Sequence, residues 1–107
     1  MRSCINIVAL SGKVGWVKLK YGSTGKLQLH FSLLQPFVKT EAGAVVNRGY
    51  SPFFCTCFKG AENYQGLLKE GSYVAVQGKI HPFTVSEGIN SLAISVDKID
   101  VYGLTEN

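Results

Sequence analysis

Aromatic and basic side chains are interleaved along much of this chain. The aromatic residues that fall in or beside strand-like segments are Trp16, Tyr21, Phe37, Tyr50, Phe53, Phe54, Phe58 and Phe83. The basic residues interleaved with them are Lys18, Lys20, Lys26, Lys39, Arg48, Lys59 and Lys79. Unpaired bases stack on flat side chains, and cationic side chains nearby follow the phosphates. The pattern is therefore typical of a groove that takes a single-stranded nucleic acid.

The phenylalanines near the middle of the chain lie on two faces, because successive side chains of a strand point to opposite sides. Phe54 and Phe58 share one face, and Phe53 shares the other with Cys55 and Cys57. The face with the small sulfur-bearing residues is the better candidate for the core. We therefore expect Phe54 and Phe58 in the groove and Phe53 in the core.

Charge is unevenly distributed along the chain, whose formal net charge is +4. Residues 1–59 contain eight lysines and arginines and one acid, whereas residues 60–107 contain three and six. A basic half favours a polyanionic partner, with ordinary solubilising charge as the alternative interpretation. Neither a basic amphipathic helix nor an apolar run of about 20 residues is visible, so nucleic acid is favoured over a membrane.

Sequence motifs for catalysis are absent: there is no Gly-rich phosphate loop, no HExxH and no GxSxG. His30 and His81 stand far apart, on the polar sides of their strands, with no acid nearby in the sequence. A carboxylate pair could form only among Glu87, Asp97 and Asp100, where solvated charge is the simpler interpretation. We expect no catalytic activity and no cofactor.

Three cysteines fit poorly with a disulfide framework. Cys55 and Cys57 lie two apart with no histidine close in sequence, which differs from the spacing of a four-ligand zinc site. We therefore expect no metal, and we interpret these thiols as small buried residues in a reducing compartment. The start of the chain lacks a separate apolar block before a cleavage site, so a cytoplasmic location is expected.

Alternation of apolar and polar residues with a period of two indicates strands that bury one face. It is clearest at Lys26–Leu33, where it predicts Phe31 in the core. Before it, Cys4–Tyr21 is expected to form one long strand that bends at Gly12 and Gly15. A short hairpin turn bounded by glycines would join these two strands.

Three further strands are predicted at Tyr50–Lys59, Ser72–His81 and Ser91–Tyr102. Residues 38–49 are interpreted as a longer loop or as an extended hairpin tip. Residues 82–90 are interpreted as a second loop, because Pro, Glu and Gly are clustered there.

Between the third and fourth predicted strands, the apolar residues of the segment 60–71 recur at helical spacing. Tyr64 is expected in the core, and Gly71 is a plausible C-terminal stop. The order β-β-β-α-β-β predicts an all-β fold, namely a five-stranded OB-fold Greek-key barrel with one short helix between strands 3 and 4. We expect a single domain over residues 1–107, with its core at about 4–102.

Four blocks of sequence carry a resemblance to a known family. They are Ile5–Gly15, Phe31–Leu33, Cys57–Glu62 and Leu68–Ile80. The last is the most diagnostic, because Lys-Glu-Gly-Ser at residues 69–72 precedes a Val-rich strand that ends at Gly78. Over about residues 4–102 the chain resembles bacterial-type single-stranded DNA-binding proteins, whose fold is the OB-fold.

The resemblance implies non-sequence-specific binding of single-stranded DNA (ssDNA) in replication, recombination and repair. It implies base stacking at Phe58 and contacts from the regions of Phe37 and Phe83. On the third strand, either Tyr50 or Phe54 would replace the tryptophan that is usual in the family.

Trp16, the one tryptophan of the chain, lies away from the family's usual stacking positions. The resemblance also implies a homotetramer formed through strand 1, with a dimer as the alternative, and a nucleoid-associated protein with replication proteins as partners. The residues 104–107 lack the family's acidic tail, so a trimmed or a tailless relative is expected. Two other functions stay open: a dimeric module similar to primosomal replication protein N, and an OB-fold that binds protein or RNA.

Overall fold

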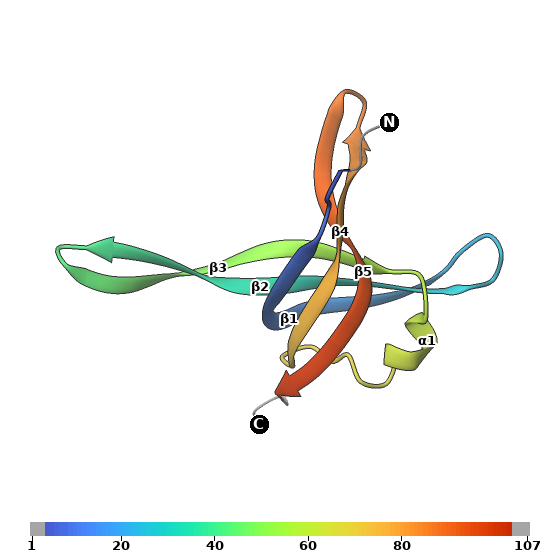
Figure 1. Cartoon of the computed structure of the whole chain (residues 1–107), viewed down its shortest axis with the longest axis horizontal. Helices are drawn as coiled ribbons and strands as arrows, with labels where there is room; N and C mark the ends of the chain where they lie inside the picture. Colours follow the sequence, from blue (N-terminus) through green and yellow to red (C-terminus); the bar gives the residue numbers. More distant parts are fainter. Residues whose placement is uncertain (1–3, 104–107) are drawn as a thin grey trace.

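Five strands close into a barrel in the computed structural model, which describes residues 4–103 (Figure 1). The elements in chain order are β1 (Val8–Tyr21), β2 (Leu27–Glu41), β3 (Ala44–Cys57), α1 (Ala61–Tyr64), β4 (Tyr73–Ser86) and β5 (Ile89–Gly103). Around the barrel the strand order is β1-β2-β3-β5-β4, and β4 pairs with β1 to complete the circle. The β3–β5 pair is parallel and the other pairs are antiparallel. The predicted all-β OB-fold barrel with one short helix is confirmed.

β1 closes the barrel because its two halves pair with different strands. Residues 8–13 pair with β4, and residues 13–21 pair with β2. The register with β2 shifts between Val14 and Val17, so β1 has a β-bulge at the bend predicted for Gly15. On β4, Gly78 lets β5 come close, because a Cβ at this position would meet the carbonyl oxygen of Ser95.

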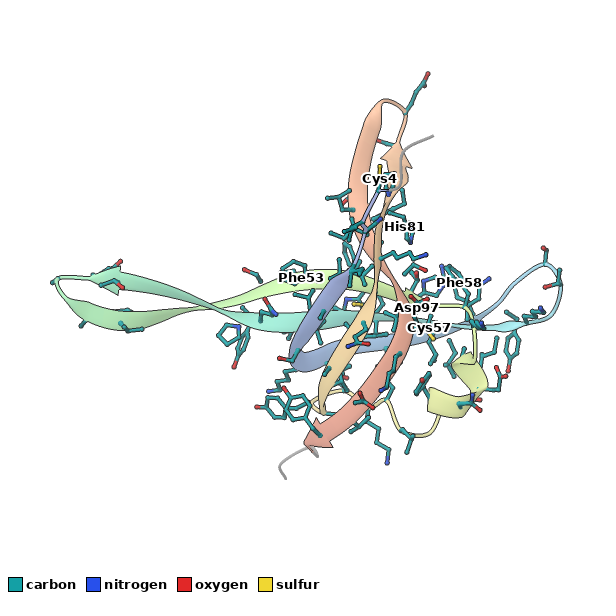
Figure 2. The ribbon with its side chains drawn as sticks, in the orientation of Figure 1. Cys4, Phe53, Cys57, Phe58, His81 and Asp97 are labelled. Carbon is teal, nitrogen blue, oxygen red and sulfur yellow. The ribbon has the colours of Figure 1, made fainter. Side chains whose placement is uncertain are left out.

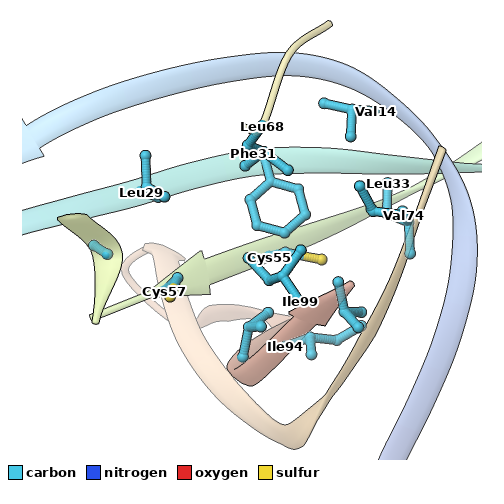
Figure 3. Close-up of a cluster of buried hydrophobic side chains, with 13 residues drawn as sticks. Val14, Leu29, Phe31, Leu33, Cys55, Cys57, Leu68, Val74, Ile94 and Ile99 are labelled. Atoms are coloured by element: carbon cyan, nitrogen blue, oxygen red, sulfur yellow. The ribbon is translucent and has the colours of Figure 1, made fainter. Parts of the chain in front are cut away.

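Inward-facing side chains from all five strands fill the barrel (Figure 3). Phe31 and the two cysteines of β3, Cys55 and Cys57, are fully buried there, as the alternation predicts. Tyr64 is half-buried and packs against this core. The other buried members of the cluster are Val14, Leu29, Leu33, Ala61, Leu68, Val74, Val76, Ile94, Val96 and Ile99.

Two hairpin arms extend away from the barrel (Figure 1). β2 and β3 continue to a tight turn at Ala42 and Gly43, so residues 38–49 form the extended hairpin tip, the second of the two interpretations. The predicted loop at 82–90 is wrong, because β4 runs to Ser86 and β5 begins at Ile89. Gly88 supplies the turn with a positive φ of 76°.

The predicted helix at 60–71 is too long, because α1 spans only four residues, Ala61–Tyr64. Gly60 precedes it without a side-chain cap, and Gly66 opposes its extension because glycine disfavours the helical backbone. The first strand begins at Val8, four residues later than expected. No helix among residues 4–103 is long and apolar enough to span a membrane.

Candidate nucleic-acid interface

A depression of about 410 Å³ lies on the outer surface of the barrel. Aromatic side chains of three strands line it, together with two histidines and Lys20. On β1 the outward positions beyond the bulge are Trp16, Lys18 and Lys20, and they lie beside His30 of β2, whose register partner is Lys18. We call this depression and its rim the groove.

A row of aromatic rings crosses the groove from β1 to β4. The rings of Trp16 and Phe54 have centroids 5.9 Å apart at an interplanar angle of 49°. Phe54 in turn meets Phe83 edge-to-face at 6.2 Å. Phe58 meets His30 edge-to-face at 6.1 Å on the side nearer α1. Because Trp16, Phe54 and Phe58 are 38%, 44% and 47% exposed, their faces are accessible to a ligand.

The parity argument for β3 is correct for the groove and wrong for Phe53. Phe53 is 36% exposed rather than buried, although it shares the inward parity of Cys55 and Cys57. The parallel pairing of β3 with β5 begins only at Cys55, and Phe53 lines a second, smaller depression with Val8 of β1 and Leu92 of β5 instead of filling the core. Phe53 on β3 and Phe58, which directly follows β3, lie well apart (Figure 2).

Three other basic candidates are exposed but do not line the groove. Lys79 lies on β4 with the parity of His81 and Phe83 and is exposed. Lys59 is exposed beside Phe58, and Lys26 is exposed at the β1–β2 turn.

The remaining candidates belong to the β2–β3 arm. Tyr50 is 53% exposed on β3 but is not among the residues that line the groove. Phe37 and Lys39 lie on β2 and Arg48 lies on β3, and their side chains fall outside the part of the structure that is described.

Residues of the groove that were not among the expected binding positions include Trp16, His30 and His81. The family resemblance places Trp16 away from the stacking positions, whereas the structure places it in the aromatic row. The sequence feature that could have indicated the outward position of Trp16 is Gly15, the preceding residue. A β-bulge at a glycine reverses which of the following side chains face outward. For His81 the signal was its parity, which it shares with the groove residue Phe83 on β4.

The histidines have different polar environments. The Nε2 of His30 lies 3.3 Å from the Gln28 side-chain oxygen, and burial followed by the nearby charge of Lys20 lowers the pKa of His30 below its ordinary value. The Nδ1 of His81 lies 3.3 Å from the carbonyl oxygen of Pro82. Its Nε2 is shielded from solvent and has no hydrogen-bond partner among the described residues. Among the polar groups of the groove, His81 thus offers a ring nitrogen that could take a further hydrogen bond.

The thiols of Cys55 and Cys57, on the inner side of β3, are expected to be unreactive. Burial raises the pKa of the Cys55 thiol to about 12. The pKa of Cys57 is also raised, first by burial and then by the negative charges of Asp97 and Glu62. Both thiols remain protonated at neutral pH, and reactive or metal-bound cysteines are thiolates. Within residues 4–103 there is no group of three or more His, Cys, Asp or Glu that could hold a metal ion.

Binding of a polyanion in the groove should depend on pH through His30. A phosphate beside the ring favours the imidazolium, which the free protein disfavours through burial and Lys20. Affinity for a dT oligomer is therefore expected to rise as the pH falls from 8 to 5.5, about tenfold for each unit by which binding raises the pKa. The His30→Gln variant should lose this part of the pH dependence. Identical pH profiles for the two proteins would remove His30 from the interface.

No protein-family model and no curated protein sequence matches the chain. Among solved structures, it is similar to a small single-stranded DNA-binding protein from Streptomyces coelicolor, with a TM-score of 0.68 and 21% identity over 90% of this chain and 93% of that one. It is also similar to a Plasmodium falciparum SSB solved in complex with ssDNA, with a TM-score of 0.76 and 20% identity over 97% and 98%. The chain thus has the OB-fold barrel of these two SSB structures.

Proposed function

We propose that this protein binds single-stranded DNA without sequence specificity, as part of replication, recombination and repair in the cytoplasm. The observation that carries the proposal is the row of half-exposed rings formed by Trp16, Phe54 and Phe83, with Lys18 and Lys20 beside it. Every base has a flat face, so such a row accepts any sequence. A duplex hides those faces between its base pairs and should bind far more weakly.

The similarity to two SSB structures supports the proposal, because one of them was solved with ssDNA. The lining of the groove supports it as well. Trp16, Phe54, Phe58 and Phe83 line it, and Lys20 supplies charge within it. Exposing phenylalanine side chains to water is unfavourable. A groove that bound only phosphates would not require these exposed rings.

Binding should weaken steeply with salt. For single strands, log K falls by about 0.7 per phosphate contact for each unit of log salt. If Lys18, Lys20, Lys59 and Lys79 each contact a phosphate, affinity should fall about 50-fold between 50 and 200 mM salt. Fluorescence anisotropy of a labelled dT oligomer at several salt concentrations measures this slope.

The salt slope also has a matched control. Lys20→Ala should reduce the slope by about 0.7. Lys98→Ala should leave it unchanged, because Lys98 lies on β5 beside Asp100 and is not among the groove residues. A flat salt response in a protein that still binds would contradict the electrostatic part of the proposal.

We also propose that the protein assembles as a homotetramer, or failing that a dimer, through the start of β1. Val8–Leu10 pairs with β4 on one edge, and no strand among residues 4–103 pairs with its other edge. Ile5 and Ile7 precede it with 89% and 79% exposure. The Asn6 side chain forms two hydrogen bonds with the backbone of Ile80, which aligns this segment with β4. An unpaired, apolar edge is a site for strand addition by a second copy.

Light scattering at micromolar concentration tests the assembly. We expect a mass several times that of one chain, and we expect Ile7→Lys to shift it toward the monomer, because burying an unpaired charge in the interface is unfavourable. A monomer in the unsubstituted protein would contradict the assembly and leave the ssDNA proposal intact.

A further inference from the structure

The β-bulge in β1 decides where Trp16 points. Val14 pairs with Leu33 and Val17 pairs with Phe31, so Gly15 and Trp16 together oppose one residue of β2, Ser32. In a regular strand Trp16 would share the inward face of Val14, which is 1% exposed. The extra residue reverses the parity, so Val17 packs against the core and Trp16 faces the groove.

Two local features fix the geometry of the bulge. The backbone N–H of Trp16 donates a hydrogen bond to the Ser32 hydroxyl oxygen at 3.0 Å, and Ser32 is 1% exposed. Gly15 leaves room for that hydroxyl, because a Cβ at this position would collide with the Ser32 oxygen and lie 3.3 Å from the Leu34 side chain. The backbone under Trp16 is therefore held by a buried contact that the barrel core supports.

The Trp16 ring has neighbours that suit a ligand-binding role. It is 38% exposed, and it leans on Phe54 at the start of the aromatic row. The Lys18 ammonium lies 5.7 Å from the ring centroid, in cation–π contact. A base stacked on this ring would displace the Lys18 ammonium. The displaced ammonium would then be close to the phosphate of the same nucleotide.

We propose that Trp16 stacks a base of the bound strand, that Lys18 contacts the adjoining phosphate, and that Gly15 and Ser32 are positioning residues for Trp16. This inference rests on the proposed function and adds to it a stacking position on β1. The path of the strand then crosses β1 as well as β3 and β4, because Trp16, Phe54 and Phe83 form one row.

Trp16 is the one tryptophan of the chain, so its fluorescence reports directly on the proposed contact. Titration with a dT oligomer should quench this emission in step with the anisotropy of a labelled oligomer. Trp16→Leu should weaken binding by about 5- to 150-fold, the range for loss of one base–aromatic stack. Tyr102→Leu is the matched control, because Tyr102 is an exposed ring of β5 that leans on Tyr73 outside the groove, and it should leave the affinity unchanged.

Separate readouts distinguish the roles of the neighbouring residues. Lys18→Ala should lower the salt slope by about 0.7, whereas Trp16→Leu should leave the slope unchanged. Ser32→Ala should reduce the maximal quenching of Trp16 at saturating dT, a spectroscopic change that a loss of stability alone would not produce. A 5-bromouracil placed in the oligomer should form its photocrosslink at Trp16.

The outcomes separate this inference from the proposed function. If the unsubstituted protein binds dT oligomers while Trp16 emission stays constant and Trp16→Leu binds within twofold of it, the stacking role of Trp16 is wrong and the function stands. If the unsubstituted protein fails to bind dT oligomers, the proposed function itself is wrong. Quenching together with affinity loss in Trp16→Leu and none in Tyr102→Leu supports the inference.

Discussion

Replacing Phe54 with alanine is expected to weaken ssDNA binding by about 1–3 kcal/mol, toward the upper end of the range for one base–aromatic stack. Phe54 is the central ring of the row and touches both Trp16 and Phe83, so its removal also leaves their facing edges unsupported. Because the Phe54 ring is 44% exposed, the thermal midpoint should change by only a few degrees. Anisotropy titration and thermal unfolding of the same preparation give both values.

Phe53→Ala is the matched control for Phe54→Ala, since it removes the same ring from the adjacent position on the other face of β3. It should leave the affinity for dT oligomers within about twofold. Its effect on stability should be smaller than that of a core truncation, because the ring is 36% exposed. If Phe53→Ala abolishes binding in a folded protein and Phe54→Ala does not, the groove lies on the wrong face of β3 in this account.

Phe31→Ala is expected to have the largest effect on folding, a loss of about 3–5 kcal/mol in the free energy of unfolding. Phe31 is fully buried at the centre of the barrel among side chains of the other strands (Figure 3). Its removal leaves a cavity that the closed barrel cannot collapse to fill. Small domains have a total stability of about 5–15 kcal/mol, so the variant should be close to the limit of folding.

Urea unfolding followed by circular dichroism measures the loss in Phe31→Ala. The thermal midpoint should fall by about 12 °C or more, given a shift of about 4–8 °C for each kcal/mol in a domain of this size. A shift of less than about 5 °C would show that the barrel core is packed differently from this description.

The barrel could be predicted from the sequence because its strands bury one face. Lys26–Leu33 alternates strictly, and the structure buries its apolar positions at Leu29, Phe31 and Leu33. The two hairpin arms were harder to predict from the sequence. Strand residues beyond the barrel have no core on either side, so their apolar and polar residues need not alternate. Residues 82–90 therefore read as a loop, although they continue β4 and β5.

Two groove assignments depended on contacts that a single strand does not reveal. The bulge could be expected at Gly15, but its effect on Trp16 depends on Ser32, which lies on the neighbouring strand. Phe53 has the parity of a core residue, but its burial depends on where β5 begins to pair with β3. Periodicity predicts which side of a strand a residue faces, and pairing with distant strands decides whether that side is covered.

The central claim is that the groove holds a single strand by its bases as well as by its phosphates. The most direct test compares three ligands of equal length at one salt concentration: a dT oligomer, an abasic oligomer with the same phosphates, and a duplex. The account predicts tight binding of dT, with much weaker binding of both the abasic strand and the duplex, because neither presents free base faces to the rings. An abasic strand or a duplex that binds as tightly as dT would contradict it.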